Sequence, residues 1–280
     1  MKGKVIVITG PTASGKSALA VDLAARLDTE IVSADSRQIY RGIPIVTAMP
    51  TAGQRARVRH HLIDMLGLHE YYSASRFEED ALQIVYRLLE ERGVAVVCGG
   101  SMMYVDAFCR GLDSLPTVPD SIRTSLMAEH AERGDEWLLE ELRRIDPEYH
   151  AVVDRCNIKR VFHAVEIVRT AGVTYTSLRT GRRVKRDFEI EKRVIDLPRE
   201  ELFGRINARV DEMVRAGLEE EAHRVYPLRH LNSLNTVGLK EMFAWFDGVM
   251  SREQAIERIK KNTRVYAKKQ LTWLKKSSLH

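Results

Sequence analysis

One stretch near the start of the chain restricts its fold more than any other. Residues 10–17 are Gly-Pro-Thr-Ala-Ser-Gly-Lys-Ser, which match the phosphate-loop pattern G-x-x-x-x-G-K-[ST]. The run Val5–Ile8 before them is apolar at every position, as in a parallel strand buried on both faces, and Leu19, Leu23 and Leu27 follow at helical spacing. A strand, a glycine loop and a helix are the context that this motif requires. We therefore expect an α/β protein that binds a phosphate group at this loop.

The residue types of the loop explain how it holds an anion. Glycines let the backbone wrap until several N–H groups point at one phosphate, and the start of the following helix adds partial positive charge. Lys16 can then bridge the outer phosphate oxygens, and the Ser17 hydroxyl can ligate Mg²⁺. We predict Mg²⁺ as the cofactor, with Ser17 as its protein ligand. The predicted diphosphate-binding residues of the loop are Gly10, Thr12, Ala13, Ser14, Gly15, Lys16 and Ser17.

The rest of the chain repeats the alternation of strand and helix. Short apolar runs predict strands at Glu30–Ala34, Val94–Cys98 and Arg193–Leu197, with a helical stretch before the second of these. This order predicts a P-loop core with a central parallel sheet flanked by helices. Residues 111–190 are polar and mostly helical, which indicates an inserted helical region. We expect three parts: the first part of the core at 1–110, the insertion at 111–190, and core completion with basic C-terminal helices at 191–280.

Composition excludes several classes of protein. Of the 280 residues, 44% are hydrophobic and 30% charged, as in an ordinary globular protein, so disordered and fibrous classes have no support. Cys98, Cys109 and Cys156 are far apart and form no C-x-x-C pair, which argues against disulfides and a sulfur-rich zinc site. The apolar run near the start is too short for a signal sequence or a membrane span. We expect a cytoplasmic protein without membrane association.

Asp35 is the candidate catalytic acid or base. It directly follows a predicted strand, whereas Val94–Cys98 runs into Gly99 and Gly100 without the acid that nucleotide-hydrolysing machines usually carry there. Ligands of open parallel sheets lie at the carboxyl ends of the strands, so Asp35 should face the phosphate site. A carboxylate in that place can deprotonate the group that attacks the bound diphosphate compound. The alternative is that Asp35 only caps the following loop or helix.

Charge gathers at the C-terminal end. Residues 201–280 contain 15 Lys and Arg against 10 Asp and Glu, which equals the net excess of +5 in the whole chain. From Arg258 to Lys276 there is no acid, and Lys261, Arg264 and Lys268 recur at helical spacing on a face other than the apolar one. The pattern favours a helix with a core side and a polyanion-binding side. A merely solvated surface is the alternative.

Several segments together resemble one family, the tRNA dimethylallyltransferases. The phosphate loop is shared with many kinases, but Asp-Ser-x-Gln-x-Tyr, His-His-Leu-Ile-Asp and Ala-Lys-x-Gln-x-Thr-Trp are far more particular. The resemblance implies transfer of a dimethylallyl group from dimethylallyl diphosphate to the N6 amine of the adenosine 3′ of the anticodon in tRNA, with release of diphosphate. The matching segments, in chain order, are 10–17, Ser33–Gly42, Thr47–Pro50, His60–Asp64, Gly99–Tyr104 and Tyr266–Leu274.

The resemblance also implies roles for individual residues. Lys16, Ser17 and Mg²⁺ would hold the departing diphosphate, and Asp35 would orient the amine and take its proton. One arginine of the pair Arg205 and Arg209 is expected to reach the diphosphate, the alternative being salt bridges with nearby acids. The insertion is expected to contact tRNA. The residues expected to contact tRNA, some of them lining a channel for the extruded base, are Asp35, Ser36, Arg37, Gln38, Ser101, Arg123, Lys159, Arg160, His163, Lys261, Arg264 and Lys268.

Some of these positions depart from the family pattern. Ser101 stands where the family usually has threonine, which keeps the hydroxyl, whereas His163 stands where an arginine is usual. Leu239 follows Gly238 where a tyrosine is common. Arg123 can equally be an ordinary exposed helix charge. His60 and His61 are adjacent and point apart in a strand or a helix, so a shared metal is not expected.

Other functions remain open at this point. A phosphate-loop kinase acting on a small hydroxyl compound, with Asp35 as base, is the main alternative. Prenyl transfer to free adenine nucleotide is a second, and a phosphate loop that only binds RNA is a third. The basic helical half favours tRNA over a small acceptor. We infer no obligate protein partner and expect a monomer.

Overall fold

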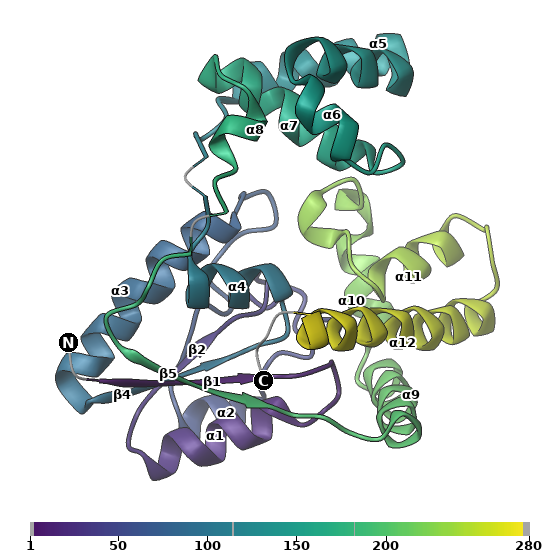
Figure 1. Ribbon diagram of the computed structural model, residues 1–280. Coiled ribbons are helices and arrows are strands. Elements are labelled where there is room, and N and C mark those ends of the chain that lie inside the picture. Colours follow the sequence, from purple (N-terminus) through teal and green to yellow (C-terminus); the bar gives the residue numbers. More distant parts are fainter. Residues whose placement is uncertain (1–2, 114, 182, 277–280) are drawn as a thin grey trace. The chain divides into compact units, whose positions relative to one another are not determined.

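The computed structural model describes residues 3–113, 115–181 and 183–276. The chain divides into two compact units, one comprising Met1–Arg110 with Lys185–His280 and the other Gly111–Val184. The first unit is an α/β layer structure, and the second is helical (Figure 1). The predicted fold class, a P-loop core with a central parallel sheet flanked by helices and a helical insertion, is confirmed.

The described residues form one five-stranded sheet in the order β3-β2-β4-β1-β5, with every pairing parallel. The strands predicted at the first three positions are present, but the prediction of a strand at Arg193–Leu197 is wrong in its position. The strand β5 begins earlier, at Glu189. It is an edge strand in which four of the six residues are charged, so no apolar run marks it. The bounds are β1 Lys4–Thr9, β2 Ile31–Ser33, β3 His60–His61, β4 Val94–Cys98 and β5 Glu189–Val194.

Helices cover both faces of the sheet. Helices α1 (Lys16–Arg26) and α2 (Ala52–Arg57) lie on one face, and α3 (Ala74–Arg92) and α4 (Met102–Arg110) on the other (Figure 1). Alternate residues of β1 therefore enter two different cores. Ile6 and Ile8 pack with the apolar side of α1, whereas Val5 and Val7 belong to the larger core on the α3 side. This burial on both faces explains the unbroken apolar run in the sequence.

The C-terminal part of the first unit is a group of helices beside the carboxyl ends of the strands (Figure 1). Helices α11 and α12 pack together, and α12 also packs on α9. Their apolar residues continue the core that covers the α3 face of the sheet. The bounds are α9 Arg199–Arg215, α10 Leu218–Val225, α11 Leu239–Phe246 and α12 Arg252–Lys276, with short 3₁₀ turns at Tyr226–Leu228 and Asn232–Leu234.

The second unit has its own apolar core. Leu126, Leu138 and Leu142 of its first helix pack against Val161 and Val165 of its third. Residues 185–190, which the sequence pattern groups with the insertion, lie in the first unit, where the Arg186 guanidinium binds the Ala107 and Phe108 carbonyls. The helices are α5 Asp120–Ile145, α6 Pro147–Val152, α7 Ile158–Ala171 and α8 Tyr175–Leu178. Within the described residues, no helix is both long and apolar enough to cross a membrane.

Candidate active site

Three loops meet at the carboxyl edge of the sheet. The phosphate loop follows β1, Asp35 follows β2, and the turn Gly99–Ser101 follows β4; these three strands are neighbours. The turn approaches the β2 end so closely that a Cβ at Gly99 would lie 2.1 Å from the Ala34 carbonyl oxygen. Only glycine fits there. The topology thus brings together the loops that the sequence predicts as the site.

The phosphate loop has the backbone that its glycines permit. Gly10 and Gly15 have φ values of 157° and 94°, and a Cβ at Gly10 would lie 2.7 Å from the Ile195 carbonyl oxygen. The Lys16 ammonium donates to the Pro11 carbonyl at 2.6 Å. Shielding from water lowers the pKa of Lys16 to about 8, an effect that Cys98 opposes. An ammonium in such surroundings is stabilised when an anion binds beside it.

The structure distinguishes the two arginines of α9. The Arg209 guanidinium reaches the phosphate loop, where its Nη1 donates to the Thr12 hydroxyl at 3.3 Å, and burial lowers its pKa. Arg205 is about half exposed and pairs with Glu201 at 2.8 Å one turn earlier on the same helix. A Cβ at Gly15 would lie 3.7 Å from Arg205 Nη1, so both guanidinium groups lie beside the phosphate loop, and Arg209 is the more deeply buried of the two.

Asp35 caps its own loop and also lines the candidate site. Its Oδ1 accepts the N–H groups of Arg37 and Gln38 at 2.9 and 3.3 Å, so the carboxylate does cap its own loop. Asp35 also lines a cavity of the first unit. The Ser101 hydroxyl accepts the Ser36 N–H at 2.8 Å and thereby fixes the residue after Asp35. The capping contacts aim the acid at the cavity.

Arg37 and Gln38 hold the loops of the site in place. The Arg37 guanidinium donates to the backbone carbonyls of Asn232 and Ser233 at 2.8 and 3.0 Å, and it lies on the cavity wall. Gln38 is buried, and its side-chain amide donates to the Thr47 carbonyl at 3.1 Å. Ser36, Arg37 and Ser101 line the cavity, whereas Gln38 supports the loop behind it. Base contact by these residues stays a prediction.

The cavity has a volume of about 360 Å³ and two kinds of wall. Thr12, Asp35 and Arg209 form a polar end beside the phosphate loop. The cavity also has an apolar wall, which was not found from the sequence because helical periodicity does not say which loop an apolar face covers. Its residues come from the loop after β2 and from α9 and α12: Val46, Ile206, Val210, Met213 and Ile259.

Gly238, Leu239 and Glu221 lie at or behind this wall and had only weak signals in the sequence. Gly238 has a φ of 103°, and a Cβ there would lie 2.4 Å from Val46 Cγ2, so the glycine permits the close approach of the two loops. Leu239, the departure from the family pattern, is fully buried in the core. The buried Glu221 carboxylate accepts the N–H groups of Ile45 and Val46, both at 2.8 Å, while burial raises its pKa. It thus holds the Val46 loop against the cavity.

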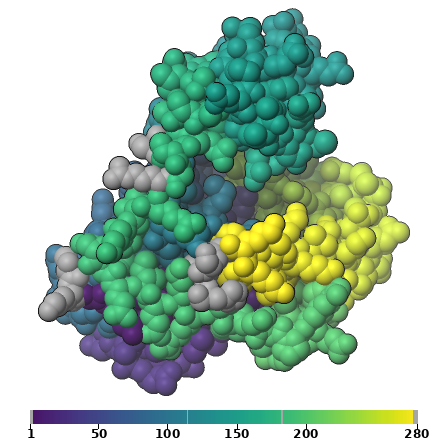
Figure 2. Space-filling view, in the orientation of Figure 1, coloured from purple at the N-terminus to yellow at the C-terminus, as the bar shows by residue number. Residues whose placement is uncertain are grey.

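The basic residues of α12 differ in their surroundings. Lys261 and Lys268 are exposed, and the Lys268 ammonium lies 5.7 Å from the centre of the Phe203 ring. Arg264 is partly buried and donates to the Asn207 side-chain oxygen of α9. In Figure 2 the yellow atoms of α12 form part of the outer surface. The expected tRNA contacts of this face stay a prediction.

Two of the four predicted tRNA contacts of the second unit bind one buried acid. The Arg123 guanidinium binds both Glu166 oxygens at 3.1 Å, and His163 Nδ1 lies 2.9 Å from the same carboxylate. Burial raises the pKa of Glu166, but the hydrogen bonds from His163 and Arg123 outweigh it and lower the pKa overall. Lys159 and Arg160 are exposed at the start of α7. His163 thus stands beside Arg123 as a second partner of Glu166.

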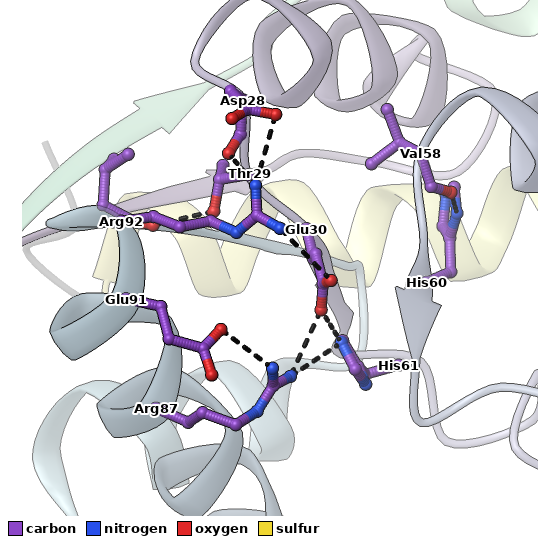
Figure 3. A network of polar contacts seen from close by, with 10 residues as sticks. Asp28, Thr29, Glu30, Val58, His60, His61, Arg87, Glu91 and Arg92 are labelled. Atoms are coloured by element: carbon purple, nitrogen blue, oxygen red, sulfur yellow. Dashed lines mark hydrogen bonds and ion pairs between the residues drawn. The ribbon is translucent and has the colours of Figure 1, made fainter.

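The adjacent histidines of β3 form a structural network (Figure 3). His61 Nε2 lies 2.5 Å from the Glu30 carboxylate, which Arg87 also binds at 3.2 Å. His60 turns the other way and contacts the Val58 carbonyl at 2.8 Å. Within the described ranges, no three His, Cys, Asp or Glu side chains gather as a metal site. The network ties the edge of the sheet to α3.

The residues present fit a Mg²⁺ ion that binds together with a diphosphate. Ser17 is exposed on the first turn of α1, next to Lys16. Mg²⁺ typically takes one or two protein ligands and completes its octahedron with phosphate oxygens and water. A single hydroxyl at a phosphate loop meets that requirement, whereas a dedicated cage of carboxylates does not occur here among the described residues.

These features define a class of protein. The fold is a P-loop α/β core, and its phosphate loop opens into a half-apolar cavity beside an acid, as expected of an enzyme that transfers a group from a phosphorylated donor. Residues 38–277 match the model of the IPP transferase family. The chain belongs to this family, and the resemblance found in its motifs is confirmed.

Curated relatives and solved structures agree with this assignment. The chain is 48% identical over 97% of its length to a protein of Parabacteroides distasonis named tRNA dimethylallyltransferase 2, of which it covers 91%. A Bacillus halodurans structure described as a tRNA isopentenylpyrophosphate transferase matches with a TM-score of 0.69 and 34% identity, over 99% of this chain and 88% of that one. A structure of a eukaryotic dimethylallyltransferase acting on tRNA matches with a TM-score of 0.83 and 25% identity, over 97% and 70%.

Proposed function

We propose that this protein, acting as a cytoplasmic monomer, transfers a dimethylallyl group from dimethylallyl diphosphate to tRNA. The acceptor is the exocyclic N6 amine of the adenosine on the 3′ side of the anticodon, and diphosphate is released. The observation that carries the proposal is the cavity, because its polar end suits a diphosphate and its apolar wall suits a short branched hydrocarbon. Neither kinase chemistry nor a phosphate loop that only binds RNA has a use for the apolar wall.

The spacing along α9 suits this donor. Arg209 reaches the phosphate loop, and Val210 and Met213 line the cavity on the same helix. A helix rises about 1.5 Å per residue, so Met213 lies roughly 6 Å along the axis from Arg209. That is about the length of a dimethylallyl group. One helix can therefore contact the diphosphate and the end of a five-carbon chain.

The chain's own groups supply the chemistry of transfer. The allylic C–O bond breaks as the N6 amine attacks the same carbon, and negative charge develops on the departing diphosphate. Lys16, Arg209 and the amides of the phosphate loop stabilise that charge. Ser17 would hold Mg²⁺, which would supply further positive charge there. Asp35 accepts the proton that the amine loses. The amine is a weak nucleophile, so its alignment with the allylic carbon contributes much of the acceleration.

Access to the cavity and the charge around it indicate how the acceptor adenosine would enter. A stacked base cannot reach a carbon inside the cavity, so the adenosine must leave the stack of the anticodon loop. Tyr266 lies at the cavity wall, 37% exposed, between Lys261 and Lys268 in the sequence of α12. The basic face of α12 would hold the RNA backbone while the base enters beside Tyr266. A free nucleotide would not need that face.

One experiment separates the donors. Unmodified tRNA is incubated with the protein, Mg²⁺, dimethylallyl diphosphate labelled at carbon 1 and ATP labelled at the γ-phosphate. The proposal predicts that only the carbon label enters the RNA. Incorporation of the phosphate label would support kinase chemistry, and label found only on added adenine nucleotide would support a small acceptor.

Sedimentation at the assay concentration tests whether the protein is a monomer.

A further inference from the structure

Gln270 connects the basic helix α12 to two loops of the site. It is 3% exposed, although its neighbours Lys268 and Lys269 face solvent. Its Oε1 accepts the Thr12 N–H at 2.8 Å, and its Nε2 donates to the Gly100 carbonyl at 2.8 Å. One side-chain amide thus joins the phosphate loop after β1 to the turn after β4.

The surroundings of Gln270 leave room for little else. A Cβ at Gly100 would lie 2.6 Å from Gln270 Nε2 and 3.7 Å from Lys16 Cε, so the amide fills the space above that glycine beside the lysine. The contact needs one acceptor and one donor at the end of a two-carbon side chain. Asparagine is one methylene short, and glutamate would set an oxygen against the Gly100 carbonyl.

Both partners of Gln270 lead directly to groups that act on the substrates. Thr12 accepts a hydrogen bond from Arg209 through its hydroxyl. Gly100 precedes Ser101, whose hydroxyl accepts the N–H of Ser36, the residue after Asp35. The Gln270 amide is therefore connected to the diphosphate side of the cavity through Thr12, and to the Asp35 side through Gly100 and its neighbour Ser101.

We propose that Gln270 is a positioning residue of the transfer reaction, which fixes the phosphate loop relative to the turn after β4 and so sets the spacing between the bound diphosphate and Asp35. It touches neither substrate. The inference rests on the donor proposed above. It also explains why the Ala-Lys-x-Gln-x-Thr-Trp segment contains a glutamine within an otherwise basic stretch.

The first test is Gln270→Leu, which keeps the volume and removes both hydrogen bonds. We expect the Kd for inorganic diphosphate and the KM for dimethylallyl diphosphate to rise roughly 10- to 100-fold, with a slower single turnover at saturation. Affinity for tRNA should stay within about twofold, because Gln270 is buried away from the basic face. The control is Trp273→Phe, which removes the 2.7 Å bond from the indole N–H to Asp106 on α4 and touches neither loop.

A second variant covers the case in which Gln270→Leu fails to fold. Gln270→Glu keeps an acceptor for the Thr12 N–H and places a carboxylate beside Lys16. The carboxylate cannot donate to the Gly100 carbonyl, so the link between the two loops is lost. We expect the Kd for inorganic diphosphate and the KM for dimethylallyl diphosphate to rise as in Gln270→Leu, while tRNA affinity stays within about twofold. A merely structural role would not give this split between the two substrates.

Three results would overturn the inference. The first is unchanged diphosphate binding and turnover in folded Gln270→Leu and Gln270→Glu. The second is an equal loss in Trp273→Phe, which would indicate general loosening of α12. The third is wild-type protein that binds no diphosphate at all, in which case the donor assignment fails as well. Normal binding by the wild type together with normal binding by both variants contradicts the role of Gln270 alone.

Discussion

The environment of Lys16 gives a testable prediction about pH. Its pKa of about 8, against an ordinary value of 10.5, follows from shielding, so the unfolded chain binds more protons between these pH values. The stability of the unliganded protein should therefore rise with pH across this window. Diphosphate needs the charged ammonium, so binding should instead weaken above pH 8.

Calorimetry of diphosphate binding between pH 7 and 9.5 tests this prediction. We expect affinity to fall as pH passes about 8 and a proton to be taken up on binding near that pH. The control is Lys16→Arg, because the arginine side chain does not titrate in this range. Any pH dependence that remains in this variant belongs to the diphosphate itself and can be subtracted. Identical pH profiles for the two proteins would show that Lys16 is not the titrating group.

Asp35 allows its structural and chemical roles to be separated. Asp35→Asn keeps the Oδ1 acceptor for the Arg37 and Gln38 amides but cannot take a proton. We expect tRNA affinity to survive and single-turnover transfer to fall roughly 10²–10⁴-fold. Asp35→Ala, which also loses the loop contacts, should lower the melting temperature in addition. Lost affinity with an intact rate for Asp35→Asn would mean that the base lies elsewhere.

At the scale of elements, α9 carries two arginines one turn apart in different environments. Arg209→Ala should raise the KM for dimethylallyl diphosphate by about 10- to 100-fold, since a hydrogen bond to a charged group contributes about 1.5–3 kcal/mol. Arg205→Ala is the comparison. The Arg205 guanidinium also lies near Gly15 of the phosphate loop, but it is half exposed and paired with Glu201, so the KM should rise less than in Arg209→Ala. The reverse order of effects in donor titrations would contradict this placement of α9.

The basic residues of helix α12 also differ in their surroundings. Lys261 and Lys268 are exposed, whereas Arg264 is bonded to Asn207. Replacing each lysine by alanine should lower the slope of log tRNA affinity against log salt by about 0.7–0.9, and Arg264→Ala should change the slope less but reduce stability. Transfer at saturating tRNA should barely change. Parallel lines for wild type and the lysine variants across a salt series would mean that this face meets only solvent.

The elements also show what the sequence could predict. The strands β1, β2 and β4 are buried on both faces and are visible as apolar runs. The edge strand β5 is not visible in this way, because four of its six residues are charged, and β3 is too short to leave a pattern. The loops of the site were predictable because parallel strands bring their carboxyl ends to one edge.

At the scale of the whole molecule, the site is assembled from distant parts of one chain. The phosphate loop, Asp35, Val46 and Ser101 lie before the second unit in the sequence, and the rest of the apolar wall and Gln270 lie after it. The 74-residue unit Gly111–Val184 lies between these parts in the sequence. Sequence patterns identified α9 and α12 as helices but not their packing against the phosphate loop, because that depends on contacts between residues nearly 260 positions apart, such as Thr12 and Gln270.

The central claim is that a dimethylallyl group moves from its diphosphate to one adenosine of tRNA. The most direct measurement is to treat unmodified tRNA with carbon-labelled dimethylallyl diphosphate, digest the product to nucleosides and locate the label by mass. We predict one labelled adenosine, carrying the group on N6 and mapping 3′ of the anticodon, and no label in a tRNA with guanosine at that position. Label on another nucleoside, or equal label in the guanosine tRNA, would contradict the account.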